Sequence, residues 1–566
     1  MKNSVLGKPA QRANLSKSGF NMSQNLKFTS SCGHLLPVYY DILNPGESVK
    51  VSFDLFTRTQ PLQTAAMVDI DEYVDLFFVP LSKVNHRMFE ILEHIQDKSS
   101  DLFENDIDYF PLIDFTAFDP EDFSQYGVYG SRYDGMTFGI LRLLDMLNIS
   151  PDILGVNVED NSLNEDYQPQ LSLLIPACYQ AIYYDYYRLS DWENNDIEAY
   201  NFDSYQNNDE SVTGAGRFEK LFQLRYRAYQ RDYFKAIQPS PLISSIGLYG
   251  NNATYLANFD SWLFMGSPVV SRKDGSGSVN PANPYAQTQL PSSYIPSAQS
   301  IRAAFAVDKL LRVTGLAGKH YDAQVLAHFG FEVPKQYSNE VVHIGGHHQV
   351  IHVGEVISTA ETSEASLGKI AGKGYSKGES EDMRYTAPCH GVLMAIYSCV
   401  PRLDYVGGID KIHTMSDRLG FYTPELDNLG MTPLFAYEME AADQFATNRF
   451  GWQYPFMHLK CKYDRATRAF CSDVYNDPDV VGTFRHWAIA YHGNLGNSSY
   501  GLSNLLCSPS DLDSIMLASY VRDVDLQDYA NYGASILYQR DPLIHSLRVS
   551  AFKTSTMSTF GLEKDI

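Results

Sequence analysis

The sequence predicts a mainly β protein, a jelly roll whose loops carry long and partly helical insertions. Strand-like segments recur far apart along the 566-residue chain, so pairing them requires long connections. Aromatic residues reach 13%, with 39 Tyr and 31 Phe, and aromatic side chains favour strands. The same Tyr excess also suits wide, partly wet contacts between subunits, and composition alone does not separate the two readings. Regular alternation of strands and helices is missing, which disfavours a doubly wound fold.

Five segments carry the strand signal. In residues 49–55, Val49, Val51 and Phe53 share one face while Lys50 and Ser52 share the other, as a half-buried strand requires. The remaining predicted strands cover residues 73–79, 391–400, 485–491 and 546–552.

Helices are expected in the connections between strands. Residues 177–189 follow Pro176, which suits a first helical turn. Residues 301–313 have apolar positions at helical spacing, and residues 320–329 end at Gly330, a normal helix stop.

Charge is unevenly distributed along a chain whose formal net charge is −23. Residues 1–30 contain five cations and no acid, which predicts an extended basic arm ahead of a jelly-roll domain at 31–566. Residues 97–122 contain nine acids, and residues 185–210 contain eight. We expect acidic surface loops at 97–170 and 190–215, and an exposed Gly/Ser/Asn/Pro-rich excursion at 243–299.

Seven scattered cysteines form no CxxC pair, which predicts free thiols of a reducing cytoplasm and neither a zinc site nor a disulfide framework. The N-terminus lacks the apolar run of a signal peptide. No stretch approaches the ~20 apolar residues that a bilayer crossing needs. We therefore expect no membrane partner.

Three basic groups are candidates for contact with nucleic acid. Residues 217–235 predict a helix with an aromatic face and a separate basic stripe, and residues 460–468 interleave cations with Tyr463 and Phe470. A cationic surface beside aromatic rings can bind single strands without sequence preference. For the two segments, a solvated basic face or pairing with acidic loops of a neighbouring subunit is the favoured alternative. The acid-free N-terminal arm is the favoured candidate for contact with nucleic acid, because a flexible arm can follow an irregular polyanion. The candidate residues are Lys2, Lys8, Arg12, Lys17, Lys27, Arg217, Lys220, Arg227, Arg231, Lys235, Lys460, Lys462, Arg465 and Arg468.

We expect no metal, no cofactor and no catalytic residue. His343, His347, His348 and His352 are accompanied by Gly345 and Gly346, which favour strand and turn over a ligand-bearing helix. No nucleophile elbow, P-loop or dinucleotide fingerprint is expected, and residues 371–378 suggest a mobile turn.

An ordered set of short segments resembles the major capsid protein of microviruses of the gokushovirus type. They are CGHLLP at 32–37, NPGE at 44–47, RDYF at 231–234, IRAAF at 301–305 and HFG at 328–330. The likeness spans about residues 30–490, with departures at 450–454, where FGWQY stands for the family's Phe-Gly-Tyr-Gln-Glu.

That resemblance implies a single eight-stranded antiparallel jelly-roll barrel that self-assembles into a T=1 shell around circular single-stranded DNA. It also implies a virion protein assembled in the bacterial cytoplasm, with a minor pilot or internal protein and a host surface receptor as further partners. The 243–299 excursion then corresponds to an outward protrusion. The acidic loops should face outward and the basic arm inward, since negative charge beside DNA is repelled.

Two other functions compete with a shell protein. One is a carbohydrate-binding jelly roll that exposes Trp262 or Trp452 on a flat face. The other is a hydrolase that uses an Asp/Glu pair, although no particular pair stands out in so acidic a chain.

Overall fold

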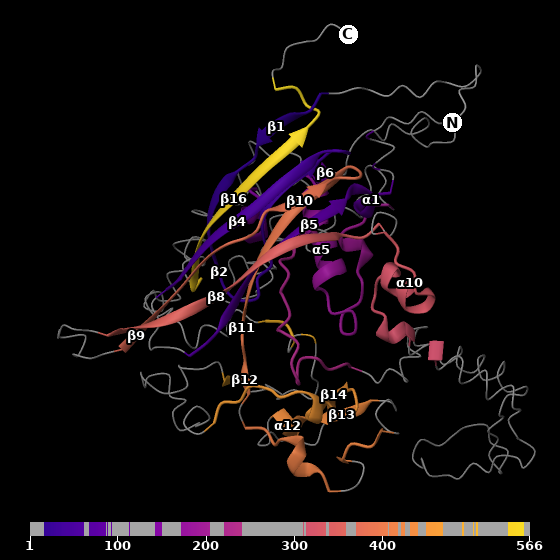
Figure 1. Ribbon diagram of the computed structural model, residues 1–566, viewed down its shortest axis with the longest axis vertical. Coiled ribbons are helices and arrows are strands. Elements are labelled where there is room, and N and C mark those ends of the chain that lie inside the picture. The colour runs from indigo at the N-terminus through magenta and orange to yellow at the C-terminus, as the bar shows by residue number, and fades with distance from the viewer. Residues whose placement is uncertain are drawn as a thin grey trace, which may run out of the picture.

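One curled antiparallel sheet of ten strands dominates the computed structural model (Figure 1). Its strands are β1 (Ser18–Asn21), β2 (Gln24–Ser30), β3 (Leu36–Leu43), β4 (Ser48–Thr59), β5 (Ile70–Pro80), β8 (Val342–Ile357), β9 (Ile370–Glu379), β10 (Met383–Thr386), β11 (Gly391–Pro401) and β16 (Leu543–Ser555). Along the sheet the order is β1-β16-β4-β9-β8-β5-β11-β3, with β10 also beside β4 and β2 also beside β16.

The structure describes part of the chain, and all structural statements concern that part. The described residues are 16–60, 67–86, 88, 92, 112–113, 142–149, 171–203, 220–239, 309–310, 313–334, 339–357, 370–405, 407–416, 420–424, 431–439, 449–467, 490–491, 502, 505–507 and 541–559.

Strands β4 and β16 are buried on one face and open on the other. Their side chains alternate between buried and more exposed positions, as the two-residue period of a half-covered antiparallel sheet requires. Strand β11 is buried along its whole length, and β5 almost so. Both faces of these two central strands are therefore covered, one by the interior of the curl and one by other elements.

Strand β8 produces much of the curl because it serves both halves of the sheet. Its residues 342–351 pair with β5, while its residues 352–357 pair with β9. At the open edge, side chains connect the two ends of the sheet. The Gln24 amide donates to the Val38 carbonyl at 3.3 Å, and the Lys553 ammonium donates to the Ile42 carbonyl at 2.5 Å. The curled sheet is thereby nearly closed into a barrel.

Short helices cover the outer face of β5 and β11. They are α1 (Leu81–Val84), α5 (Leu174–Ile182), the π-helix η4 (Tyr183–Tyr187) and the 3-10 helix η5 (Ile197–Ala199), accompanied by the small pair β6 (Leu112–Ile113) and β7 (Leu171–Ser172). The α5 segment contributes buried apolar residues such as Ala177, Cys178 and Ile182.

A smaller layer lies below the sheet in Figure 1. It contains β12 (Asp404–Tyr405), η7 (Lys411–Thr414), β13 (Thr432–Phe435), α12 (Ala436–Met439), β14 (Arg449–Gln453), α13 (Met457–Lys460) and β15 (Ala490–Tyr491). Helix α10 (Tyr321–Phe329) stands to the right of the sheet in the same view.

The predicted fold class is confirmed at the level of a mainly β, antiparallel, curled sheet. The sheet has ten strands instead of the predicted eight: seven strands make up its main body, and the shorter β1, β2 and β10 pair along β16 and β4. Residues 18–30, expected in the basic arm, form β1 and β2 against β16. Four predicted strands match β4, β5, β11 and β16, and of residues 485–491 only 490–491 are described.

The predicted helices agree with the structure to different degrees. Helix α10 ends at Gly330, which has a left-handed φ of 67°, as expected. Helix α5 begins at Leu174 and passes into η4. Most of residues 301–313 and all of the 243–299 excursion lie outside the described residues, as do residues 97–170 apart from 112–113 and 142–149.

Two local predictions were wrong. Residues 371–378 belong to strand β9 instead of a turn, because β4 and β8 pair with both of its sides. Residues 217–235 do not form one helix: after a short helical turn at 220–222 the backbone is irregular. Its hydrogen bonds go to distant segments, from Leu35 N to Arg225 O, from Arg227 N to Gly33 O and from Tyr229 N to Leu505 O. Burial against the sheet thus outweighed the helical spacing of the aromatic residues.

Candidate nucleic-acid and subunit interfaces

Most cations of the 217–235 segment are used inside the subunit. Lys220 lies 3.0 Å from Asp196 and 3.3 Å from Glu198, and the hydrogen bond to Asp196 raises its pKa. Lys235 is buried 4.6 Å from the Tyr229 ring centroid, and burial lowers its pKa to about 7. Arg231 is exposed, whereas Arg217 lies outside the described residues.

Arg227 belongs to a buried charge cluster on the outer face of β5. Its guanidinium donates to Asp75 at 3.2 Å and to the Ser398 hydroxyl at 2.8 Å. Tyr187 also donates to Asp75, at 2.9 Å, and His343 lies 3.5 Å away. Burial alone would raise the pKa of Asp75, but the hydrogen bond from His343 and the charge of Arg227 hold it below its ordinary value.

A similar cluster surrounds Asp71, which lies four residues before Asp75 in β5 and therefore on the same face of the sheet. Its fully buried carboxylate accepts from His348 at 2.9 Å, from Arg402 at 2.9 and 3.2 Å, and from Gln230 at 2.7 Å. Burial would raise the pKa of Asp71, yet the bonds from Arg402 and His348 hold it lower. The two clusters attach the irregular segment and β8 to β5, so these cations serve cohesion of the subunit.

Inside the curl, Glu72 gathers side chains from four other strands. Its carboxylate accepts from Thr57 at 2.7 Å, Tyr397 at 2.8 Å, Gln349 at 2.8 Å and Ser376 at 2.5 Å. All of these donors come from different strands, so the network fixes the register of β4, β8, β9 and β11 around β5.

His545 extends this network to β16 and β2. Its Nδ1 lies 2.9 Å from the Thr57 hydroxyl and its Nε2 lies 2.7 Å from the Ser30 hydroxyl. A neutral ring with its proton on Nδ1 satisfies both contacts. Burial lowers the pKa of His545 to about 3, which agrees with a neutral ring.

The expectation that the chain lacks a nucleophile-elbow motif was wrong for the sequence pattern, because the predicted turn contains one. Residues 374–378 read Gly-Tyr-Ser-Lys-Gly, which has the elbow's spacing. An elbow places its serine at a sharp strand-to-helix turn, whereas Ser376 lies within strand β9, is buried, and donates to Glu72. The surroundings of Ser376 therefore support a structural role.

The four clustered histidines lie along β8, which passes through as one strand with a register shift near Gly345 and without the expected turn. His343 and His348 approach Asp75 and Asp71, while His347 lies 3.3 Å from Gln349. Within the described residues, no group of His, Cys, Asp and Glu has an arrangement that could hold a metal ion.

The open face of the sheet presents a cationic and aromatic surface, which we call the basic sheet face. The register places Lys377, Phe56, Ser546 and Lys27 in one row across β9, β4, β16 and β2. An adjacent row contains Tyr375, Arg58 and Ile544. Lys27, Arg58, Lys373, Lys377, Arg384 and Arg548 are exposed on these strands, as are the rings of Phe56, Tyr375 and Phe552.

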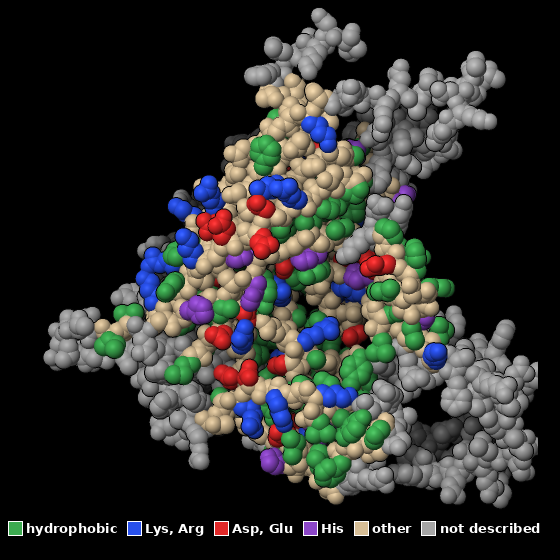
Figure 2. Space-filling model, in the orientation of Figure 1, with side chains coloured by type: hydrophobic (Ala, Val, Ile, Leu, Met, Phe, Trp, Pro, Cys, Tyr) green, Lys and Arg blue, Asp and Glu red, His purple; other side chains and the backbone are tan. Residues whose placement is uncertain are grey.

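Figure 2 shows Lys and Arg side chains gathered at the upper left, over the strands of this face, with some acidic side chains among them. The acids are concentrated toward one end, where Asp54 and Glu379 are opposite each other and Asp382 pairs with Lys50 at 2.7 Å. The other end, around Phe56 and Arg58, combines cations with aromatic rings, which is the chemistry of sequence-tolerant single-strand binding.

Of the cations on the basic sheet face, only Lys27 is among the candidates that the sequence indicated. Arg58, Lys377 and Arg548 are isolated in the sequence and become neighbours through strand pairing. The available signal was the alternation of β4 and β16, because cations at the polar positions of neighbouring strands must share one face.

The remaining candidates are dispersed. Lys17 donates to the Gly46 carbonyl at 3.1 Å. Lys460, Lys462 and Arg465 are exposed beside α13, with Lys462 4.0 Å from Asp410. Lys2, Lys8, Arg12 and Arg468 lie outside the described residues.

The structure also describes Trp452, which the carbohydrate-binding alternative requires to be exposed on a flat face. Trp452 is half-buried in β14, exchanges backbone hydrogen bonds with Gln238, and lies 5.8 Å from Arg449, so it forms no flat exposed platform. Trp262 lies outside the described residues. Of the cysteines described, Cys178, Cys399 and Cys507 are free and buried, Cys389 and Cys461 are free and half-buried, and Cys32 is buried. None of the helices in the described part of the chain is both long and apolar enough to cross a membrane.

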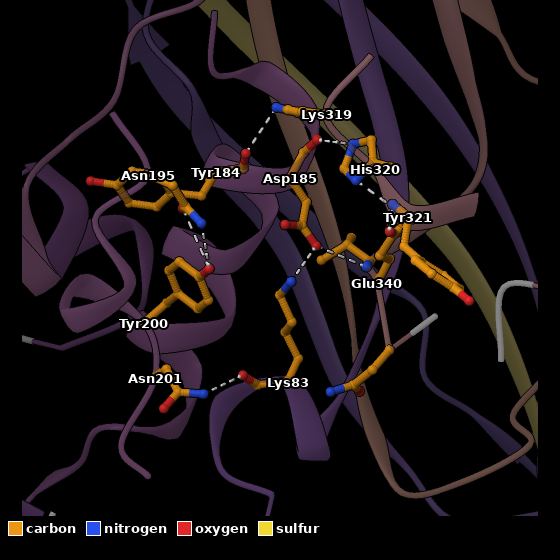
Figure 3. A network of polar contacts seen from close by, with 12 residues as sticks. Lys83, Tyr184, Asp185, Asn195, Tyr200, Asn201, Lys319, His320, Tyr321 and Glu340 are labelled. Carbon is orange, nitrogen blue, oxygen red and sulfur yellow. Dashed lines mark hydrogen bonds and ion pairs between the residues drawn. The ribbon is translucent and has the colours of Figure 1, made fainter. Parts of the chain in front are cut away.

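A polar network attaches α10 to the helices on the outer face (Figure 3). Lys319 donates to the carbonyls of Tyr184 at 2.9 Å and Arg188 at 3.1 Å, although burial lowers its pKa to about 8. Asp185 lies 3.0 Å from the Lys83 ammonium. These bonds hold the segment before α10 firmly against η4.

Comparison with known proteins gave one family. The model of a family described as capsid protein (F protein) matches residues 168–488, which include α5, the irregular segment after residue 220 and strands β8 to β11. A search of curated proteins gave no match.

Proposed function

The chain belongs to the capsid protein (F protein) family of microviruses, and we propose that its copies assemble into a closed T=1 icosahedral shell around circular single-stranded DNA. The observation that carries this proposal is the family match over residues 168–488. The curled antiparallel sheet supports the proposal, because such a sheet forms a rigid scaffold whose loops are free to contact neighbouring subunits.

The basic sheet face is the surface that we assign to the genome. A protein with a net charge of −23 repels DNA over most of its surface, so contact requires a local excess of cations. Phe56 and Tyr375 beside Arg58 and Lys377 supply aromatic faces for bases and charges for phosphates. The basic residues 1–15 can add to this contact from the chain's N-terminal end.

The same proposal gives the other partners. The protein acts in the virion and is assembled in the cytoplasm of a bacterial host, with a pilot or internal protein inside and a host receptor outside. The 243–299 segment is proposed as the outward protrusion. No catalytic step is proposed, since Glu72, Asp71 and Asp75 each serve several internal hydrogen bonds.

Particles purified from cells that express the chain with a circular single-stranded genome test this proposal. We expect nuclease-resistant single-stranded DNA to co-sediment with the particles and to become sensitive when they are dissociated. Empty particles, or particles that protect only RNA or duplex DNA, would refute the assignment of the cargo.

A further inference from the structure

Helix α10 stands on the subunit with none of its side chains fully buried and with those of residues 322–325 half-buried. None of its residues, Tyr321–Phe329, is buried, whereas α5 buries nearly all of its residues. Figure 1 shows α10 beside the sheet instead of against it. Because a nine-residue helix is only marginally stable alone, its apolar side chains require contact from elsewhere.

The apolar side chains of this helix form a continuous surface, which we call the α10 face. Tyr321, Val325 and Phe329 follow each other at intervals of four residues and so lie on one side of the helix. Phe329 is 81% exposed. Leu310, Leu316, Leu326 and Phe331 are further exposed apolar residues of this region. Exposed apolar patches of this kind mark interaction sites.

The α10 face is presented rigidly. Besides the contacts of Lys319, His320 lies 2.8 Å from the Asp185 carbonyl and 3.4 Å from Glu340 (Figure 3). Gln324 donates to the carbonyls of Thr314 at 2.9 Å and Gly318 at 2.7 Å, which ties α10 to the turn before it. A preformed face loses little conformational entropy on binding.

A second exposed apolar surface lies on the small layer below the sheet, and we call it the lower face. It is formed by Ile409, Ile412, Phe421, Tyr422 and Leu459. Lys460, Lys462 and Arg465 are exposed beside it, together with Asp464. The α10 face has Asp322 and Glu332 at its border, with Lys309 further along the chain. One apolar surface is therefore bordered mainly by acids and the other mainly by cations.

We propose that the α10 face of one subunit docks on the lower face of a second copy of the same chain, with Phe329 entering among Phe421, Tyr422 and Leu459. This inference rests on the proposed function, since it names one of the contacts by which the shell is built. The two faces are different surfaces of one molecule, so their contact is head-to-tail, and repetition of such a contact forms a ring when the rotation between neighbouring subunits closes. Rings of subunits are what an icosahedral shell is made of.

The first test replaces one residue of the α10 face, Phe329, and the neighbouring exposed Leu326 with acids. The double variant Leu326→Asp/Phe329→Asp should raise the subunit concentration at half-assembly at least about tenfold, because two apolar anchors are lost. The melting temperature of the unassembled subunit should stay unchanged, since neither side chain is buried. Met67→Asp, at a residue 70% exposed elsewhere, is the matched control and should assemble like the wild type.

The outcomes separate this inference from the proposed function. If wild type and double variant assemble equally, the docking is wrong while the shell function stands. If the wild type never assembles, both are wrong. A lower melting temperature of the unassembled variant with normal assembly would mean that the chain's own residues cover α10, which also overturns the docking. If the double variant forms normal particles that only fail to infect, α10 contacts a host partner and the docking between subunits is wrong.

Cross-linking tests the partner surface directly. A mixture of Phe329→Cys chains and Tyr422→Cys chains should form interchain disulfides on oxidation of assembled particles, above the background from half-buried Cys389 and Cys461 in the wild type. Cross-links between two Phe329→Cys chains, in place of mixed ones, would show a symmetric contact and overturn the head-to-tail arrangement.

Discussion

At the scale of single residues, Glu72 illustrates how this barrel is specified. Its partners Thr57, Gln349, Ser376 and Tyr397 are scattered over more than 300 residues of the sequence, yet all reach one carboxylate. The sequence identifies β5 as a strand through its apolar residues, but no local pattern predicts which distant hydroxyls a buried acid will meet. Pairing of strands far apart creates the site.

His545 gives a pH-dependent prediction. Its pKa in the folded protein is about 3, below the ordinary value of about 6.5. As the pH falls from 6.5 to 5, the unfolded state takes up a proton that the folded state does not, so this residue lowers stability with a slope that approaches about 1.4 kcal/mol per pH unit. In His545→Gln that contribution disappears. Urea unfolding of the unassembled subunit at several pH values should show a shallower slope for the variant.

Other groups set the window for that experiment. The pKa of His34 is also lowered by burial and acts in the same direction, while the hydrogen bond to Glu340 raises the pKa of His320, which acts in the opposite direction. Asp71 and Asp75 have lowered pKa values and lose stability only at more acidic pH. Equal slopes for wild type and variant between pH 6.5 and pH 5 would contradict the neutral, buried state of His545.

At the scale of elements, the irregular segment 223–238 replaces a predicted helix and fastens the outer layer to the sheet. Arg227 is its main connection, through Asp75, Ser398 and the Tyr73 ring, whose centroid lies 3.9 Å away. We expect Arg227→Ala to lower the free energy of unfolding by about 3 kcal/mol, because the buried Asp75 loses its charged partner. Denaturant unfolding of the unassembled subunit measures this.

Arg231→Ala is the matched control in the same segment, because Arg231 is exposed. It should change the free energy of unfolding by less than about 0.5 kcal/mol. Equal effects of the two substitutions would mean that the pairing with Asp75 contributes nothing to stability.

The basic sheet face gives a prediction about DNA. Arg58→Gln and Lys377→Gln should each weaken binding of the unassembled subunit to single-stranded DNA of any sequence, and should each reduce the slope of log affinity against log salt by about 0.7. Phe56→Ala should cost about 1–3 kcal/mol of binding free energy through lost stacking. Fluorescence anisotropy over a salt series measures both.

A substitution on the irregular segment provides the control for that prediction. Arg231→Gln removes an exposed cation that is not on the basic sheet face, and it should leave affinity and salt slope unchanged. If Arg231→Gln weakens binding while Arg58→Gln does not, the nucleic-acid surface lies on the irregular segment, as the sequence first suggested.

The elements also show what sequence alone could predict. The alternation of β4 and β16 and the Gly330 stop of α10 are local signals, and the structure contains these elements as expected. The 217–235 segment was misassigned because its aromatic spacing suits a helix, while its backbone bonds with residues 33–35 and 505–507 are non-local. Gly33 lies where these distant segments come close together. Its φ of 80° and the nearby Cys507 carbonyl exclude a larger residue at this position.

At the scale of the whole molecule, many cations of the described residues are either paired internally or collected on one sheet face, while Arg231 and the group near α13 are exposed elsewhere. Composition predicted neither arrangement, because the cations of the basic sheet face come from strands separated by long insertions. The ordered family motifs did predict the class of protein, and the family match over residues 168–488 confirms it.

Self-assembly is the central claim, and electron microscopy of the purified chain across protein concentrations, salt concentrations and pH tests it most directly. We predict closed shells of uniform diameter with icosahedral symmetry. Monodisperse single subunits under every condition tried would contradict it.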